Sequence, residues 1–148
     1  MKKVLILAMV FNVSCGPSGP DFDEDHAFEY LLKQCEFGPR NPSSEGYYKC
    51  LEFMLDELDK TAEDIIIQEF SYQEKKHRTR HDLSNVIARY NIDSEIQTII
   101  SCHWDTRPWS DSEPNRKDRN QPIIGANDGG SGVAAVSYTH LRAHETGY

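Results

Sequence analysis

The sequence lacks an excess of basic residues, a long apolar run and closely paired cysteines. Its 16 lysines and arginines are outnumbered by 24 aspartates and glutamates, and phosphate binding requires a basic face, so we do not expect nucleic acid as a partner. The longest apolar stretch, residues 4–11, is too short to span a bilayer. None of the four cysteines stands in a Cys-x-x-Cys spacing, which argues against a zinc site built from thiolates.

The first residues have the organisation of an export signal. Two lysines precede the apolar stretch, and Val13-Ser14-Cys15 resembles a bacterial lipoprotein cleavage box. This pattern predicts a lipoprotein signal peptide over residues 1–15, a lipid on Cys15 and a flexible tether over residues 16–21. An ordinary secretory peptide is the alternative. Both routes export the protein from the bacterial cytoplasm, and the lipid would anchor it to the membrane, in the periplasm or at the cell surface.

The body of the chain alternates between helical and extended patterns. We expect two helices, the second capped by Ser43 or Ser44, then a hairpin, a buried third strand and a final helix. The two helices are expected over residues 25–35 and 44–58, and the strands of the hairpin over 65–72 and 83–90. The third strand is expected over 96–102 and the final helix from 133 onward. This order predicts an α/β fold with a mixed sheet in layers. Cys35 and Cys50 fall on the two helices, where they either pair or remain buried thiols.

Two polar motifs follow the expected third strand. His103-Trp104-Asp105 comes directly after it, and Asp128 stands in a glycine-rich turn before the final helix. Open α/β sheets build their sites at the carboxyl ends of strands, so we expect these side chains to meet. A neutral imidazole and a carboxylate are natural zinc ligands, and a ligating histidine usually needs an acceptor for its other ring nitrogen. We therefore predict His103 and Asp128 as metal ligands, with Asp105 as that acceptor.

These motifs resemble signatures of the co-catalytic zinc exopeptidases and, within that superfamily, of the bacterial glutaminyl cyclases. The similar stretches are HWDTRPW at 103–109, PIIGANDGGSGV at 122–133, FGPR at 37–40 and NVI at 85–87. The resemblance implies that residues 22–136 are the N-terminal part of a catalytic domain, a three-layer α/β/α sandwich with a mixed β-sheet. Such domains are about twice as long as this chain, so the resemblance also implies a truncated domain.

The resemblance further implies that the full-length parent is a zinc-dependent glutaminyl-peptide cyclotransferase, acting on peptide or protein N-termini. In that enzyme one zinc is bound by Asp128, a Glu and a His; Asp105 is the candidate catalytic residue, and Trp104 and Trp109 are candidate substrate contacts. The alternative is an aminopeptidase with two zincs, with His103 among the ligands and Asp128 bridging. A third interpretation is an inert truncation or a surface binding module, because the later ligands are absent from this chain and we expect it to be inactive alone.

The last twelve residues differ from the rest. Helical apolar periodicity is lost after Val136, and residues 137–148 resemble the translated sequencing-adapter read-through that ends many metagenomic gene fragments. We therefore expect this tail to be foreign to the domain. His140 and His144 have the i,i+4 spacing of zinc-binding helices, but the stretch offers neither a third ligand nor a packed face. They are not predicted as ligands.

Overall fold

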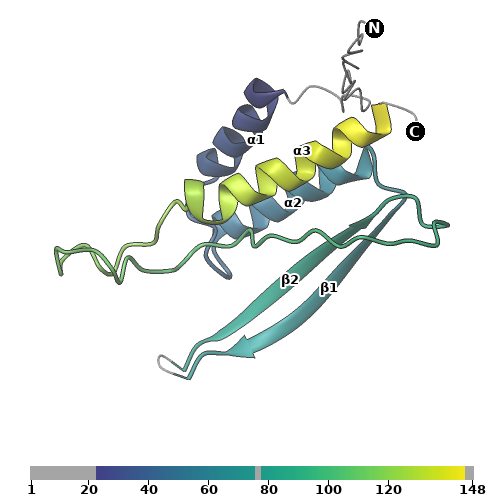
Figure 1. Ribbon diagram of the computed structural model, residues 1–148. Helices are drawn as coiled ribbons and strands as arrows, with labels where there is room; N and C mark the ends of the chain where they lie inside the picture. Colours follow the sequence, from purple (N-terminus) through teal and green to yellow (C-terminus); the bar gives the residue numbers. More distant parts are fainter. Residues whose placement is uncertain (1–22, 76–77, 146–148) are drawn as a thin grey trace, which may run out of the picture.

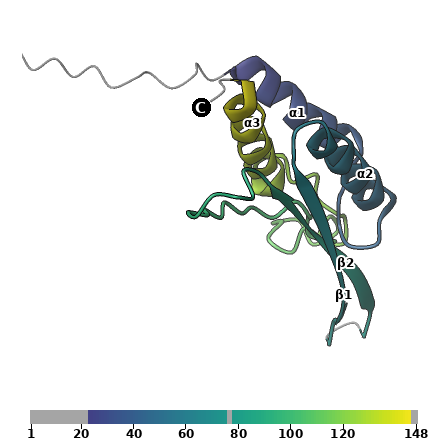
Figure 2. The same cartoon turned by 90° about the vertical axis from the view of Figure 1, so that its right-hand side faces the viewer.

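The computed structural model describes residues 23–75 and 78–145, with side chains as far as Tyr138. Three helices pack together, and a long hairpin projects from them (Figure 1, Figure 2). In chain order the elements are α1 (Glu24–Glu36), α2 (Glu45–Asp59), β1 (Asp64–Gln73), β2 (Arg80–Arg89), the turn η1 (Ala126–Gly130) and α3 (Ser131–Glu145). The expected signal peptide, the lipid site Cys15 and the tether lie outside the described residues.

The first two helices begin where a polar side chain caps them. The Asp23 carboxylate accepts a hydrogen bond from the His26 N–H at 3.0 Å, and the Ser44 hydroxyl accepts one from the Tyr47 N–H at 3.1 Å. Such acceptors satisfy N–H groups that have no partner within the first helical turn. Ser44 is therefore the cap of α2. Within the described ranges no helix combines the length and the apolar character needed to cross a membrane.

The hydrophobic core lies where the three helices meet. Its buried members come from all three: Tyr30, Cys50, Met54, Val133 and Ala134. Burial raises the pKa of the Cys50 thiol to about 11, so this thiol stays protonated near neutral pH and is a poor nucleophile. Cys35 and Cys50 are free thiols, so the alternative of a disulfide between them is not realised. The helical part of the fold is held by packing.

The hairpin confirms the two strands expected from the sequence. β1 and β2 pair antiparallel over their full length, which places Ile66 directly opposite Ile87. Both isoleucines are 42% exposed, and Phe70 is 45% exposed. A two-stranded ribbon cannot bury an apolar face by itself. The hairpin therefore leaves large apolar side chains in contact with solvent.

The expected third strand over residues 96–102 is wrong for this chain. The described part of the molecule contains one sheet, made of β1 and β2, and Ile96 and Ile99 are 83% and 91% exposed. Cys102, expected to be buried at the strand end, is exposed too. At Ser84 of β2 the backbone N–H donates to the Tyr47 hydroxyl at 2.7 Å and the carbonyl accepts from the Trp104 indole at 3.3 Å. At Ser84, the side chains of Tyr47 and Trp104 thus form the hydrogen bonds that a neighbouring strand would otherwise form with the N–H and the carbonyl.

Helix α3 continues to Glu145, although the sequence predicted a loss of helical periodicity after Val136. Tyr138 is 4% exposed, its hydroxyl accepts a hydrogen bond from the Asp23 N–H at 3.1 Å, and its ring lies 5.8 Å from that of His26. One aromatic residue thus supplies the contact with α1 that the periodicity of the sequence did not reveal. The side chains of His140 and His144 lie outside the described ones.

Candidate metal centre

The structure brings His103, Asp105 and Asp128 together. The His103 Nε2 atom lies 3.1 Å from an Asp128 carboxylate oxygen, and its Nδ1 atom lies 3.5 Å from an Asp105 carboxylate oxygen. The imidazole therefore stands between the two carboxylates. The three side chains are 46–57% exposed, so this cluster faces solvent and is open to a ligand.

The turn η1 places Asp128 beside His103. Inside η1 the backbone leaves the helical conformation at Asp128 and Gly129, and Gly129 has a φ of 95°. A Cβ atom on Gly129 would lie 3.1 Å from both His103 Cε1 and the Asp105 carbonyl oxygen. Glycine is required here because it adopts this φ without strain and lets the turn approach the imidazole. The glycine-rich stretch is thus what allows the two motifs to meet.

The His103 and Asp128 side chains fit zinc in ligand type and in spacing, but two ligands are too few to hold the ion. Two ligands bound to a tetrahedral zinc at about 2.0–2.1 Å lie about 3.3 Å apart, close to the 3.1 Å between His103 and Asp128. The Nδ1 atom lies 3.2 Å from the Asp105 carbonyl oxygen, so a proton there can be donated and Nε2 is left for a metal. Among the described residues, however, no group of three His, Cys, Asp or Glu is arranged to hold a metal ion.

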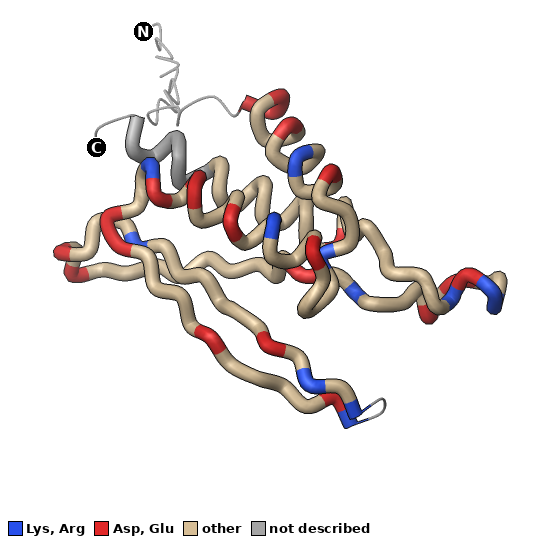
Figure 3. Tube along the Cα trace, turned by 180° about the vertical axis from the view of Figure 1, so that it is seen from behind, with Lys and Arg blue, Asp and Glu red and all other residues tan. Residues whose placement is uncertain are grey.

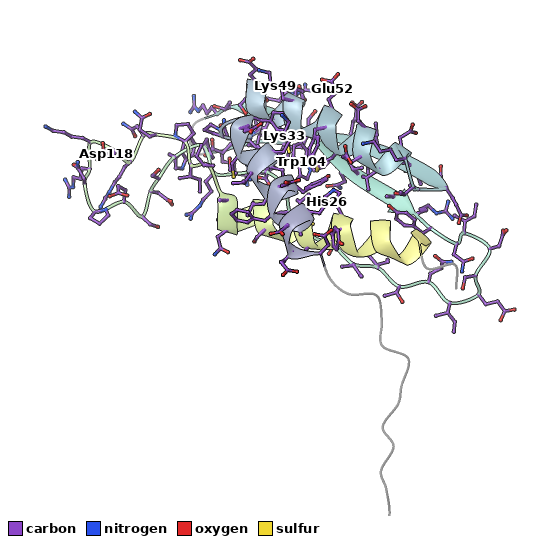
Figure 4. All side chains as sticks on the ribbon, turned by 90° about the horizontal axis from the view of Figure 1, so that it is seen from above. His26, Lys33, Lys49, Glu52, Trp104 and Asp118 are labelled. Atoms are coloured by element: carbon purple, nitrogen blue, oxygen red, sulfur yellow. The ribbon has the colours of Figure 1, made fainter. Side chains whose placement is uncertain are left out.

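The two tryptophans predicted as substrate contacts differ in position. Trp104 lines an open hollow of about 510 Å³ between β2 and the segment 101–105, together with His103 and Asp105. Its ring also packs on that of Tyr47, with 4.1 Å between the centroids, and Figure 4 shows it within the body of the molecule. Trp109 is half-buried at the start of the following loop and is not part of the hollow. Trp104 thus combines a packing role with a position beside the cluster.

The loop over residues 110–121 projects away from the helices, with Asp118 far from the body (Figure 1, Figure 4). Its base is closed by a hydrogen bond from the Ser110 hydroxyl to the Gln121 carbonyl at 2.9 Å. Charges of both signs follow one another along it (Figure 3). At its start, Arg107 pairs with Asp111 at 2.8 Å and lies 4.0 Å from Asp128. A cation that the sequence reasoning missed therefore borders the candidate site.

Arg40 is the second residue whose importance the sequence reasoning missed. It is fully buried, and its guanidinium donates hydrogen bonds to backbone carbonyls next to both motifs. The stretch FGPR was noticed as a family-like segment, but nothing in its pattern indicates a buried arginine. Arginine is rarely buried without a paired acid, so only the tertiary structure reveals this position.

The fold of this chain is similar to that of several known enzymes. The glutaminyl cyclase of Bacteroides thetaiotaomicron, in a structure bound to N-acetylhistamine, is similar with a TM-score of 0.82 and 31% identity. A leucine aminopeptidase precursor from the same organism is similar with a TM-score of 0.83 and 31% identity. A Zn-dependent exopeptidase from Parabacteroides distasonis is similar with a TM-score of 0.83 and 29% identity. Each comparison covers 88% of this chain and 44% of the relative. This chain therefore spans less than half the length of these relatives.

Residues 85–145 also match peptidase family M28. The matched range begins on β2 and contains both the His103 and the Asp128 motifs. No curated protein matches this chain. The α/β fold and the resemblance stated from the sequence are confirmed by these comparisons, whereas the roles of individual site residues are left as predictions.

Proposed function

Because this chain belongs to the superfamily that contains the M28 peptidases and the bacterial glutaminyl cyclases, we propose that its parent protein is a zinc-dependent glutaminyl-peptide cyclotransferase. It would convert an N-terminal glutamine of a peptide to pyroglutamate and release ammonia. The observation that carries this proposal is the 3.1 Å approach of His103 to Asp128, beside a hollow that Trp104 lines. Similarity to a glutaminyl cyclase over most of this chain supports it.

Three side chains of this chain would take part in the reaction. Asp128 and His103 would hold zinc, which supplies a Lewis acid for the γ-carbonyl of the glutamine. The α-amine of the same glutamine attacks that carbon, and the γ-amide nitrogen leaves as ammonia. The exposed Asp105 carboxylate would take the proton from the amine and return it to the leaving nitrogen. Its place 3.5 Å from the His103 Nδ1 atom also lets it hold the imidazole in orientation.

The indole of Trp104 would form a wall for the substrate side chain. Its N–H is engaged by the Ser84 carbonyl, so it offers an apolar face and no hydrogen bond. Such a wall suits the methylene groups of a glutamine folded back on its own amine. Trp109 is proposed as a contact only on the strength of the sequence motif.

A two-zinc aminopeptidase is the second candidate function. It is favoured by the similarity to a leucine aminopeptidase precursor, which is as high as that to the cyclase. In this case Asp128 would bridge both ions and His103 would ligate one of them. The two candidates differ in product: the cyclase leaves the peptide backbone intact and releases ammonia, whereas the aminopeptidase releases a free amino acid.

The test uses the natural protein that contains these residues, loaded with zinc. We expect Gln-initiated peptides to lose one ammonia, measured by mass spectrometry and a coupled ammonia assay, and Leu-initiated peptides to stay intact. Asp128→Asn should abolish ammonia release, since a neutral amide is a far weaker zinc ligand than a carboxylate. Asp118→Asn, in the projecting loop, is the matched control and should keep full activity. Release of free leucine by the wild type would reverse the order of the two candidates.

A further inference from the structure

Arg40 is a buried cation held only by backbone carbonyls. The residue is 0% exposed, and its guanidinium donates to the carbonyls of Trp104 and Gly125 at 3.0 Å each. Further donations reach Ile124 at 3.0 Å and Gln34 at 3.3 Å. Among the described residues no Asp or Glu forms an ion pair with it. Its charge is therefore balanced by carbonyl dipoles, and these four hydrogen bonds fix the orientation of the guanidinium.

These partners flank the candidate metal centre on both sides. Trp104 directly precedes Asp105, and Thr106 directly follows it. The Arg40 backbone N–H donates to the Thr106 hydroxyl at 2.9 Å, and the Thr106 N–H donates to the Arg40 carbonyl at 3.2 Å. Arg40 thereby holds the peptide groups on either side of Asp105. Its Nη2 atom holds the carbonyl of Gly125, the residue before η1.

The turn that carries Asp128 is held at its other end as well. The Gly130 N–H donates to the Gly125 carbonyl at 3.1 Å, which is the same carbonyl that Arg40 binds. The buried Gln34 amide donates to the Gly130 carbonyl at 3.1 Å. A Cβ atom on Gly130 would lie 3.3 Å from Arg40 Nη2. The guanidinium is thus packed directly under η1, between the two motif segments.

We propose that Arg40 is the positioning residue that sets the separation of His103 and Asp128, and with it the affinity of the site for zinc. The zinc part rests on the proposed function, whereas the positioning of the two loops does not. Arginine is suited to this role because its planar fork reaches several acceptors at fixed angles, whereas a lysine has one ammonium at a single point. Residues that orient metal ligands typically change metal affinity by about 10- to 100-fold when mutated.

The test compares Arg40→Lys with the wild type, both in the natural protein that contains these residues, by amide hydrogen exchange and by zinc titration calorimetry. The amides of Thr106, Ile123 and Gly130 report on the loops, because each is hydrogen bonded within or between them. We expect their exchange to accelerate about tenfold or more, with the amides of α2 little changed, and zinc affinity to fall about 10- to 100-fold. Thr106→Val, which removes one acceptor, is the milder second variant and should give a smaller change of the same kind.

Met54→Leu is the matched control, since it changes a buried side chain of the helical core and removes no hydrogen bond of Arg40. It should leave zinc affinity and the three loop amides unchanged. Uniform acceleration of all amides in Arg40→Lys and Thr106→Val, with zinc affinity unaltered, would overturn the proposal and assign Arg40 to global stability. If the wild type binds no zinc but the loop amides respond as expected, the positioning role of Arg40 is upheld and the metal assignment in the proposed function fails.

Discussion

The helical half of this molecule forms a buried core, whereas the half formed by the hairpin and the segment 96–102 does not. Tyr47 and Cys50 on α2 are 1% and 0% exposed, but Ile96 and Ile99 are 83% and 91% exposed. A helix satisfies its backbone hydrogen bonds internally and needs only one packed face. A strand needs neighbours on its edges and layers on its faces. Apolar side chains are therefore buried in the core of the helical half, whereas those of the other half are open to solvent.

The candidate site belongs to the helical half. His103 and Asp128 lie on loops held by Arg40 beneath and by the start of α3. The hairpin adjoins the site through the hollow, and it hydrogen bonds to Tyr47 and Trp104 at Ser84. The two proposed ligands thus lie on segments that the helical core and Arg40 hold in place.

The largest effect on stability is expected when packing is removed from the helical core. Met54→Ala should lower the free energy of unfolding by about 2–5 kcal/mol, because it deletes a buried side chain and leaves a cavity. Urea unfolding followed by circular dichroism measures this change. Leu32→Ala, on a residue of α1 that is 47% exposed, is the control and should cost far less. Equal losses in both variants would show that the core is not where the stability lies.

A smaller effect concerns pH and the buried thiol of Cys50. Its pKa is raised from 9.0 to about 11 by burial, so the folded state holds the proton more tightly than the unfolded state. The resulting stability is complete below pH 9 and is lost as the pH rises from 9 towards 11, by about 2 kcal/mol. Urea unfolding at several pH values measures it. Cys50→Ala should flatten this part of the profile, and a profile identical to wild type would contradict the assignment.

The smallest effect on stability is expected in the exposed half. Ile99→Lys should change the free energy of unfolding by less than about 0.5 kcal/mol, because the side chain contacts mainly water. It should nevertheless reduce association and the binding of a hydrophobic dye, since it interrupts an exposed apolar run. Light scattering and dye fluorescence are the measurements. A large loss of stability would show that residues 96–102 are packed in solution.

The sequence was most informative where a pattern is read locally. Caps and apolar spacing predicted α1 and α2, and alternating apolar residues predicted the hairpin. His103, Asp105 and Asp128 were expected to meet at the carboxyl end of a strand over residues 96–102, and they do meet, although the described residues form no strand there. The prediction failed for residues 96–102, because an apolar run defines a strand only when a neighbouring strand pairs with it. It also did not predict that α3 extends to Glu145 or that Tyr138 contacts α1.

The helices, the hairpin and the chemical identity of the proposed ligands follow from local patterns, because capping, periodicity and side-chain chemistry act over a few residues. The tertiary structure was needed to show that Arg40 is buried under both motif loops and that Trp104 packs on Tyr47 while lining the hollow. It also decided that the 96–102 segment stays exposed. The contacts of Arg40 with the motif loops join segments more than sixty residues apart. Such contacts arise from how layers pack, which local sequence patterns do not encode.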